Sequence, residues 1–111
     1  MAEAAARASM VRFVDVHGTL RADPPNVPLD RGGTLSLEYD GKAPPMLFVP
    51  DDRIFGGMLF MMKEGERWHL ELTVLRDAPV MEIPYALYAP DRNEIAEGES
   101  PPRMTVKDPG L

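Results

Sequence analysis

The hydrophobic residues of this chain recur mostly at every second position, which is the pattern of a β-strand with one buried face. Residues 34–39 alternate most cleanly, with Leu35, Leu37 and Tyr39 on one side and polar residues on the other. Residues 66–75 continue the same alternation over a longer stretch. The pattern therefore predicts two half-buried strands in the middle of the chain.

Three further segments are predicted as strands because they are short and rich in β-branched or other apolar residues. Residues 11–20 are one, although their apolar positions change phase between Phe13 and Val14, which indicates a bulge or burial on both faces. Residues 80–88 are another, and a proline inside them places this strand at an edge or a bulge. Residues 103–107 are predicted as a short final strand.

Residues 54–62 change to a period typical of a helix. Asp51 or Asp52 stands where an N-cap is expected, and Gly65 marks the end. A helix of about ten residues is marginal alone, so we expect it to be held against a sheet. Its predicted buried face consists of Ile54, Phe55, Met58, Leu59 and Met62.

Five or six strands with one brief helix predict an α+β domain, an antiparallel half-barrel sheet wrapped around that helix. Residues 11–108 are expected to form this single domain, and residues 1–10 a flexible N-terminal lead. The segment 21–33 is rich in proline and glycine and is predicted as a surface loop.

Composition narrows the possible functions. A chain of 111 residues forms one domain at most, and its 44% apolar content is that of a globular protein. The net charge of −6 argues against nucleic acid as a partner. No run approaches the roughly 18 apolar residues of a membrane span, so we expect no membrane insertion. Without cysteine the compartment stays open.

Candidate catalytic chemistry is sparse. His17 and His69 are the only histidines and lack the spacing of a metal site, so neither a metal nor a cofactor is expected. No serine stands in the setting of a nucleophile. The acidic segment 91–102 is interpreted as a solvated loop.

Several motifs nevertheless resemble the FKBP-type peptidyl-prolyl isomerases. The most specific covers residues 54–72, the predicted helix followed by a strand, with Met62, Gly65, Glu66 and Trp68 in register. Shorter matches are residues 14–20, the pair Leu29-Asp30, the stretch from Gly41-Lys42 through Pro44 to Phe48, and residues 83–88.

The resemblance implies an apolar pocket that binds a twisted X–Pro amide better than a planar one, without a general base. Phe48 would be its wall and Phe55 its floor, and Asp30 would lie near the substrate carbonyl. Tyr88, or less well Tyr85, would donate the hydroxyl hydrogen bond. The implied partners are proline-containing segments of other proteins.

The chain departs from the family at Val16, where tyrosine is usual, and at Asp51 to Arg53, which bring charge to the pocket mouth. These departures keep a second hypothesis open, a non-catalytic FKBP-like β module that serves as an interaction subunit of a larger assembly. A third is a β-sandwich carrier unrelated to this family.

Overall fold

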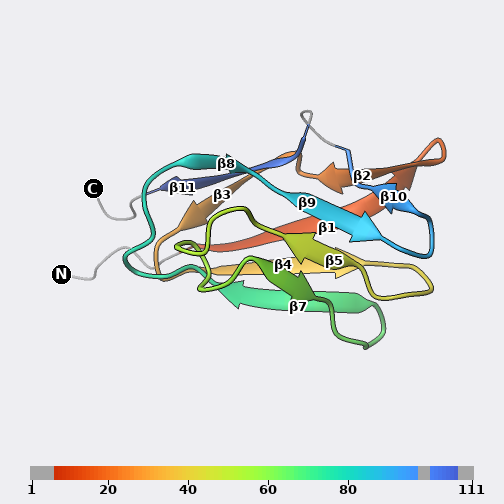
Figure 1. The fold of residues 1–111 in the computed structure, drawn as a ribbon, viewed down its shortest axis with the longest axis horizontal. Coiled ribbons are helices and arrows are strands. Elements are labelled where there is room, and N and C mark those ends of the chain that lie inside the picture. The colour runs from red at the N-terminus through yellow and green to blue at the C-terminus, as the bar shows by residue number, and fades with distance from the viewer. Residues whose placement is uncertain (1–6, 98–100, 108–111) are drawn as a thin grey trace.

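A computed structural model describes residues 7–97 and 101–107, and these residues form eleven β-strands in three sheets and no helix (Figure 1). The predicted α+β half-barrel around a helix is therefore wrong, and the described fold is all-β. None of these residues belongs to a helix that is long and apolar enough to cross a membrane.

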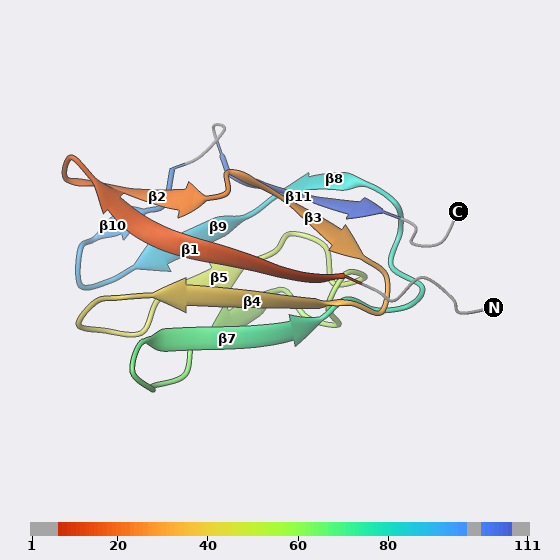
Figure 2. The ribbon, with the colours of Figure 1, turned by 180° about the vertical axis from the view of Figure 1, so that it is seen from behind.

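The first layer is one four-stranded sheet, seen in front in Figure 2. Its order is β2-β1-β4-β7, in which β1 and β4 run parallel and the other pairs antiparallel. His17 and Gly18 form the β1–β2 hairpin turn, with φ of 53° and 84°, as a type I′ turn requires. The strands of this sheet are β1 (Ala8–Val16), β2 (Thr19–Asp23), β4 (Thr34–Tyr39) and β7 (Trp68–Thr73).

The second layer contains two sheets with the orders β3-β11-β8 and β10-β9-β5-β6. Only Tyr85 separates β8 from β9, so one length of chain continues through both sheets. The two layers lie face to face as a sandwich (Figures 1 and 2). The strands are β3 (Asn26–Asp30), β5 (Met46–Phe48), β6 (Leu59–Met61), β8 (Glu82–Pro84), β9 (Ala86–Ala89), β10 (Glu94–Ile95) and β11 (Arg103–Lys107).

The core fills the space between the layers. Each strand contributes alternate residues to it because successive side chains point to opposite faces of a sheet. The fully buried members from both layers include Leu35, Leu37, Leu47, Leu87 and Met104. The clean alternation of residues 34–39 and 103–107 predicted β4 and β11 correctly, and the predicted strand at 66–75 contains β7.

Backbone hydrogen bonds join the two layers at both sides. Lys63, just after β6, exchanges two bonds of 2.7 and 2.9 Å with His69 of β7. On the other side, Glu97 bonds to Leu20 and Ala22 of β2, both at 2.8 Å. These contacts cover part of the strand edges, which would otherwise present unpaired backbone groups.

The segment predicted as a helix, residues 54–62, contains the end of a turn, a bend and the three residues of β6, and no helix. A single turn forms where Gly56 N donates to Asp52 O at 2.9 Å, and it stops at Gly56, whose φ is +85°. Of the two expected capping residues, Asp51 does accept a bond from a backbone amide, that of Arg53, and its carboxylate also binds the Arg53 guanidinium, but no helix follows. The chain then continues into β6.

Three smaller expectations also change. Segment 21–33 is not one loop, since it contains the end of β2, a turn at the cis Asp23–Pro24 bond, and β3. Segment 11–20 is a hairpin, and its phase change reflects the exposed hairpin end rather than a bulge. Strand β1 begins at Ala8, inside the expected lead. Residues 1–6 of that lead lie outside the described part.

Candidate functional site: an apolar sheet face

The outer face of the β10-β9-β5-β6 sheet carries three of the four most exposed large apolar side chains among the described residues. Directly paired residues of an antiparallel sheet point to the same face, so the register shows which residues share it. Phe48 of β5 is paired with Leu59 on one side and Ala86 on the other. Met46 is paired with Met61 and Tyr88, and Tyr88 with Ile95. We call these seven residues the apolar face: Met46, Phe48, Leu59, Met61, Ala86, Tyr88 and Ile95.

Solvent reaches this face because the opposite face of the same strands forms the core. Leu47 and Leu87 point inward and are completely buried. On the outer side, Leu59, Ile95, Met61 and Phe48 are 63%, 57%, 55% and 42% exposed. An aromatic side chain carries roughly 150–250 Å² of surface and a large aliphatic one somewhat less, so these residues together expose several hundred Å² of apolar area. Patches of this size on a monomer are often interaction sites.

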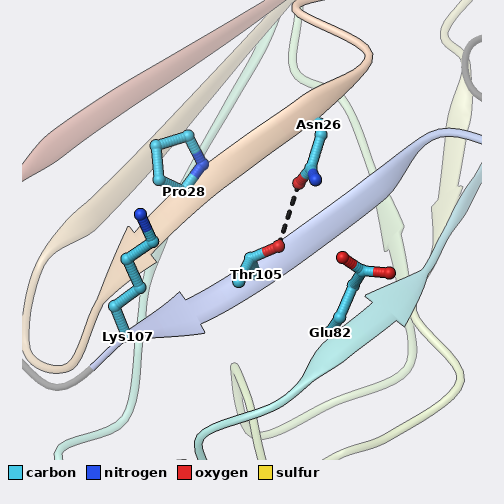
Figure 3. A pocket seen from close by; sticks show the side chains of 5 residues that line it. All are labelled: Asn26, Pro28, Glu82, Thr105 and Lys107. Atoms are coloured by element: carbon cyan, nitrogen blue, oxygen red, sulfur yellow. Dashed lines mark hydrogen bonds between the residues drawn. The ribbon is translucent and has the colours of Figure 1, made fainter.

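The neighbouring half of the same layer has a different character. The outer face of the β3-β11-β8 sheet presents polar side chains around a hollow of about 380 Å³ (Figure 3). Thr105 donates a 3.0 Å hydrogen bond to Asn26 across it. The residues lining the hollow are Asn26, Pro28, Glu82, Thr105 and Lys107. The apolar face is therefore not a general property of this layer.

The first layer also presents a mostly polar outer face. Glu38 of β4 binds Arg12 of β1 at 3.2 Å and Arg67, just before β7, at 3.3 Å. Met10 of β1 shares this face, since it is paired with Ser36, and it is 43% exposed. Val14 and Val16 of β1 are also exposed on this side, by 37% and 40%, but the Arg12–Glu38 ion pair separates them from Met10. Scattered apolar residues of this kind are ordinary on protein surfaces. A continuous set of seven is not.

Charged groups lie at one end of the apolar face, in the turn between β9 and β10. Arg92 binds Asp15 at 2.7 Å and Glu94 at 3.0 Å, and these hydrogen bonds raise the pKa of the Arg92 guanidinium. The Tyr88 hydroxyl donates a 2.9 Å bond to Asn93 Oδ1. Arg92 is thus neutralised by its two carboxylate partners, and Tyr88 directs its polar tip toward the turn.

The predicted pocket is not assembled. Phe48 and Tyr88 both belong to the apolar face, at diagonal positions of neighbouring strands. Phe55 is half-buried and instead packs edge-on against Phe60, 6.3 Å between ring centres. Asp30 ends β3 in the other sheet, where its carboxylate accepts a 2.8 Å bond from Arg7 N.

The alternative hydroxyl donor, Tyr85, is also unsuited to meet a substrate. It is only 2% exposed and packs edge-on against Phe13, with 6.5 Å between the ring centres. Its hydroxyl has no hydrogen-bond partner within the described residues. Burial raises the pKa of this phenol.

Sequence reasoning missed five members of the apolar face: Met46, Leu59, Met61, Ala86 and Ile95. A signal for three of them was present, because residues 46–49 and 58–62 are uninterrupted apolar runs. Such runs are typical of strands that are covered on both faces, although they do not distinguish strand from helix.

Comparison with known proteins assigns no family. No protein-family model matches the sequence, and no curated protein shows significant similarity to it. Within residues 7–97 and 101–107, no three acidic or histidine side chains gather in a way that could hold a metal ion. The apolar face is the candidate site because its exposed, uncharged side chains are suited to contact with another apolar surface.

Proposed function

We propose that this chain is a non-catalytic β module that binds a protein through the apolar face. The observation that carries the proposal is the unbroken set of seven apolar side chains across four strands, on a layer whose other half is polar. Covering such a surface removes apolar area from water, which is the main favourable term in protein association.

The properties of the side chains support binding to a protein surface. Two of the seven are methionines, whose flexible thioether side chains adapt to irregular partners. Phenylalanine and tyrosine add large, comparatively rigid contact area. None of the seven carries a charge that binding would have to desolvate.

The isomerase activity implied by the FKBP resemblance stays a prediction, and the described geometry gives it less support. That hypothesis placed Phe55 on a helix as the floor of a pocket shared with Asp30, Phe48 and Tyr88. In the structure these four residues are divided between two sheets and a turn. Only the pair on the apolar face lies on one surface.

Position-specific cross-linking tests the proposal. A photoreactive benzoylphenylalanine replaces Phe48 in the full chain, expressed in cells that produce the protein naturally. The matched control carries the same group at Met10, which is 43% exposed where Phe48 is 42%. We expect adducts heavier than the 12.3 kDa chain from position 48 at several times the yield from position 10. Equal yields at the two positions would refute the proposal.

A further inference from the structure

We infer that the protein bound by the apolar face is a second copy of this chain, packed face to face with the first as a symmetric dimer. This inference rests on the proposed function, since it names the occupant of the same surface. It depends on three features of the face: its area, its strand order and the sequence of large and small side chains across it.

The area suits a dimer of modest affinity. Two faces that each present several hundred Å² would bury about 1,000 Å² together, the lower limit for a specific interface. The seven side chains supply an apolar centre without charge, as the buried centre of an interface requires. An interface at this lower limit is of the size that weak, transient complexes have, so we expect association in the micromolar range rather than a permanent dimer.

The strand order fits a two-fold axis. The sheet has four strands, β10-β9-β5-β6, so an axis parallel to the strands and between β9 and β5 covers every strand with another. In this arrangement β5 of one copy lies over β9 of the other, and β6 lies over β10. Two sheets packed in this aligned way lie about 10 Å apart, as in a sandwich core.

The side chains across the face complement themselves under this axis. Phe48 and Ala86 are direct neighbours, so the ring of each Phe48 lies over the small Ala86 of the second copy. Met46 and Tyr88 are also direct neighbours, so each thioether meets a tyrosine ring, a favourable contact. At the outer strands Met61 meets Ile95, and Leu59 extends past Ile95, the last residue of β10. An isologous interface needs this kind of self-complementarity.

Charge predicts how salt acts on the dimer. Each copy carries a net charge of −6, and the face itself has none, so the copies repel at a distance while their contact is apolar. Salt screens that repulsion, and the dimer therefore tightens as the salt concentration rises. A basic partner at the same face would bind less tightly in salt.

Sedimentation equilibrium of the purified full chain tests the dimer between 1 and about 300 μM, in the range expected for an interface of this size. We expect the mass to rise from 12.3 kDa toward twice that value, and to rise further in 0.5 M salt. Phe48→Glu should weaken the dimer by about 30-fold or more, the effect of losing a central anchor. Met10→Glu should leave it unchanged.

A second matched pair of variants tests the interface even if Phe48→Glu fails to fold. Ile95→Glu lies on the face and Val80→Glu off it, with 57% and 58% exposure at the two positions. Circular dichroism and thermal unfolding establish that each variant is folded. Equal dimerisation of the face and control variants would overturn the inference.

Cysteine chemistry tests the proposed axis, because the chain has no cysteine of its own. A short bis-maleimide should join a mixture of Met61→Cys and Ile95→Cys chains at least several times faster than either variant alone. A parent chain that stays at 12.3 kDa at every concentration would refute the dimer. If the dimer were refuted but position 48 still cross-linked to a different protein in cells, the proposed function would hold and only the inference of a dimer would be wrong. If position 48 also gave no specific adduct, both the proposed function and the dimer would be refuted.

Discussion

Two buried tyrosines make a matched test of how hydrogen bonding stabilises this fold. Tyr39 and Tyr85 are each 2% exposed, so replacing either by phenylalanine removes one hydroxyl from the interior. The Tyr39 hydroxyl donates to the carboxylate of Asp91, at 2.9 and 3.1 Å from its two oxygens. The Tyr85 hydroxyl has no partner among the described residues. The two substitutions should therefore act in opposite directions.

The magnitudes follow from the free energy of hydrogen bonds. A hydrogen bond to a charged acceptor contributes about 1.5–3 kcal/mol. Asp91 is exposed and regains a water molecule when its partner is lost, so we expect Tyr39→Phe to lower the free energy of unfolding by about 1–2 kcal/mol. A buried hydroxyl without a partner carries a desolvation cost, so Tyr85→Phe should be neutral or stabilise by up to about 1 kcal/mol. The expected difference between the two variants is about 2 kcal/mol.

Urea unfolding measures this difference directly. Trp68 is the only tryptophan, and its Nε1 donates to Gly41 O at 3.0 Å, so its fluorescence reports on the contact between β7 and the β4–β5 connection. The slope of free energy against urea should be the same in both variants, which shows that only stability changed. The reasoning fails if Tyr85→Phe proves more destabilising than Tyr39→Phe.

Three other predictions concern stability and activity. Burial and the bond to Asp91 raise the pKa of Tyr39 to about 12. The stability that the neutral phenol provides should therefore hold below about pH 10 and decline as the pH rises toward about 12. Urea denaturation at a series of pH values should show a steeper decline for the parent chain than for Tyr39→Phe. A Cβ at Gly33 would overlap the backbone carbonyl of Arg7, so Gly33→Ala should lower the free energy of unfolding by about 2 kcal/mol or more, read from its urea midpoint. In a coupled peptide assay, 10 μM chain should not accelerate cis-to-trans relaxation of a proline peptide; acceleration abolished by Phe48→Ala would restore the isomerase hypothesis.

Strands with one buried face were predictable from the sequence. In β4 and β7 the apolar residues alternate with polar ones because one face meets the core and the other meets water. The same reasoning failed for β3, where prolines suggested a loop. Pro28 fits there because β3 is an edge strand, with one side that needs no ladder hydrogen bonds.

The candidate site was predicted only in part. Phe48 and Tyr88 were singled out by their place in a resemblance, and they do lie on the apolar face. Their neighbours from β6 and β10 were not found, because sheet pairing between distant segments decides which residues share a face. Ile95, for example, joins the face through Tyr88, and its surrounding acidic sequence suggested only a solvated loop.

One feature of the sequence explains both the wrong prediction of a helix and the existence of the apolar face. Residues 58–62 are apolar at every position, and this removed the alternation by which a strand would have been predicted. A strand covered only on its inner side has no need of apolar residues on the outer side. Here Leu59 and Met61 on the outer side are as apolar as Phe60 on the inner side, yet they are 63% and 55% exposed. The composition of β6 is thus that of a strand covered on both faces, whereas the described residues cover only its inner face, and the proposed interface would supply the second cover.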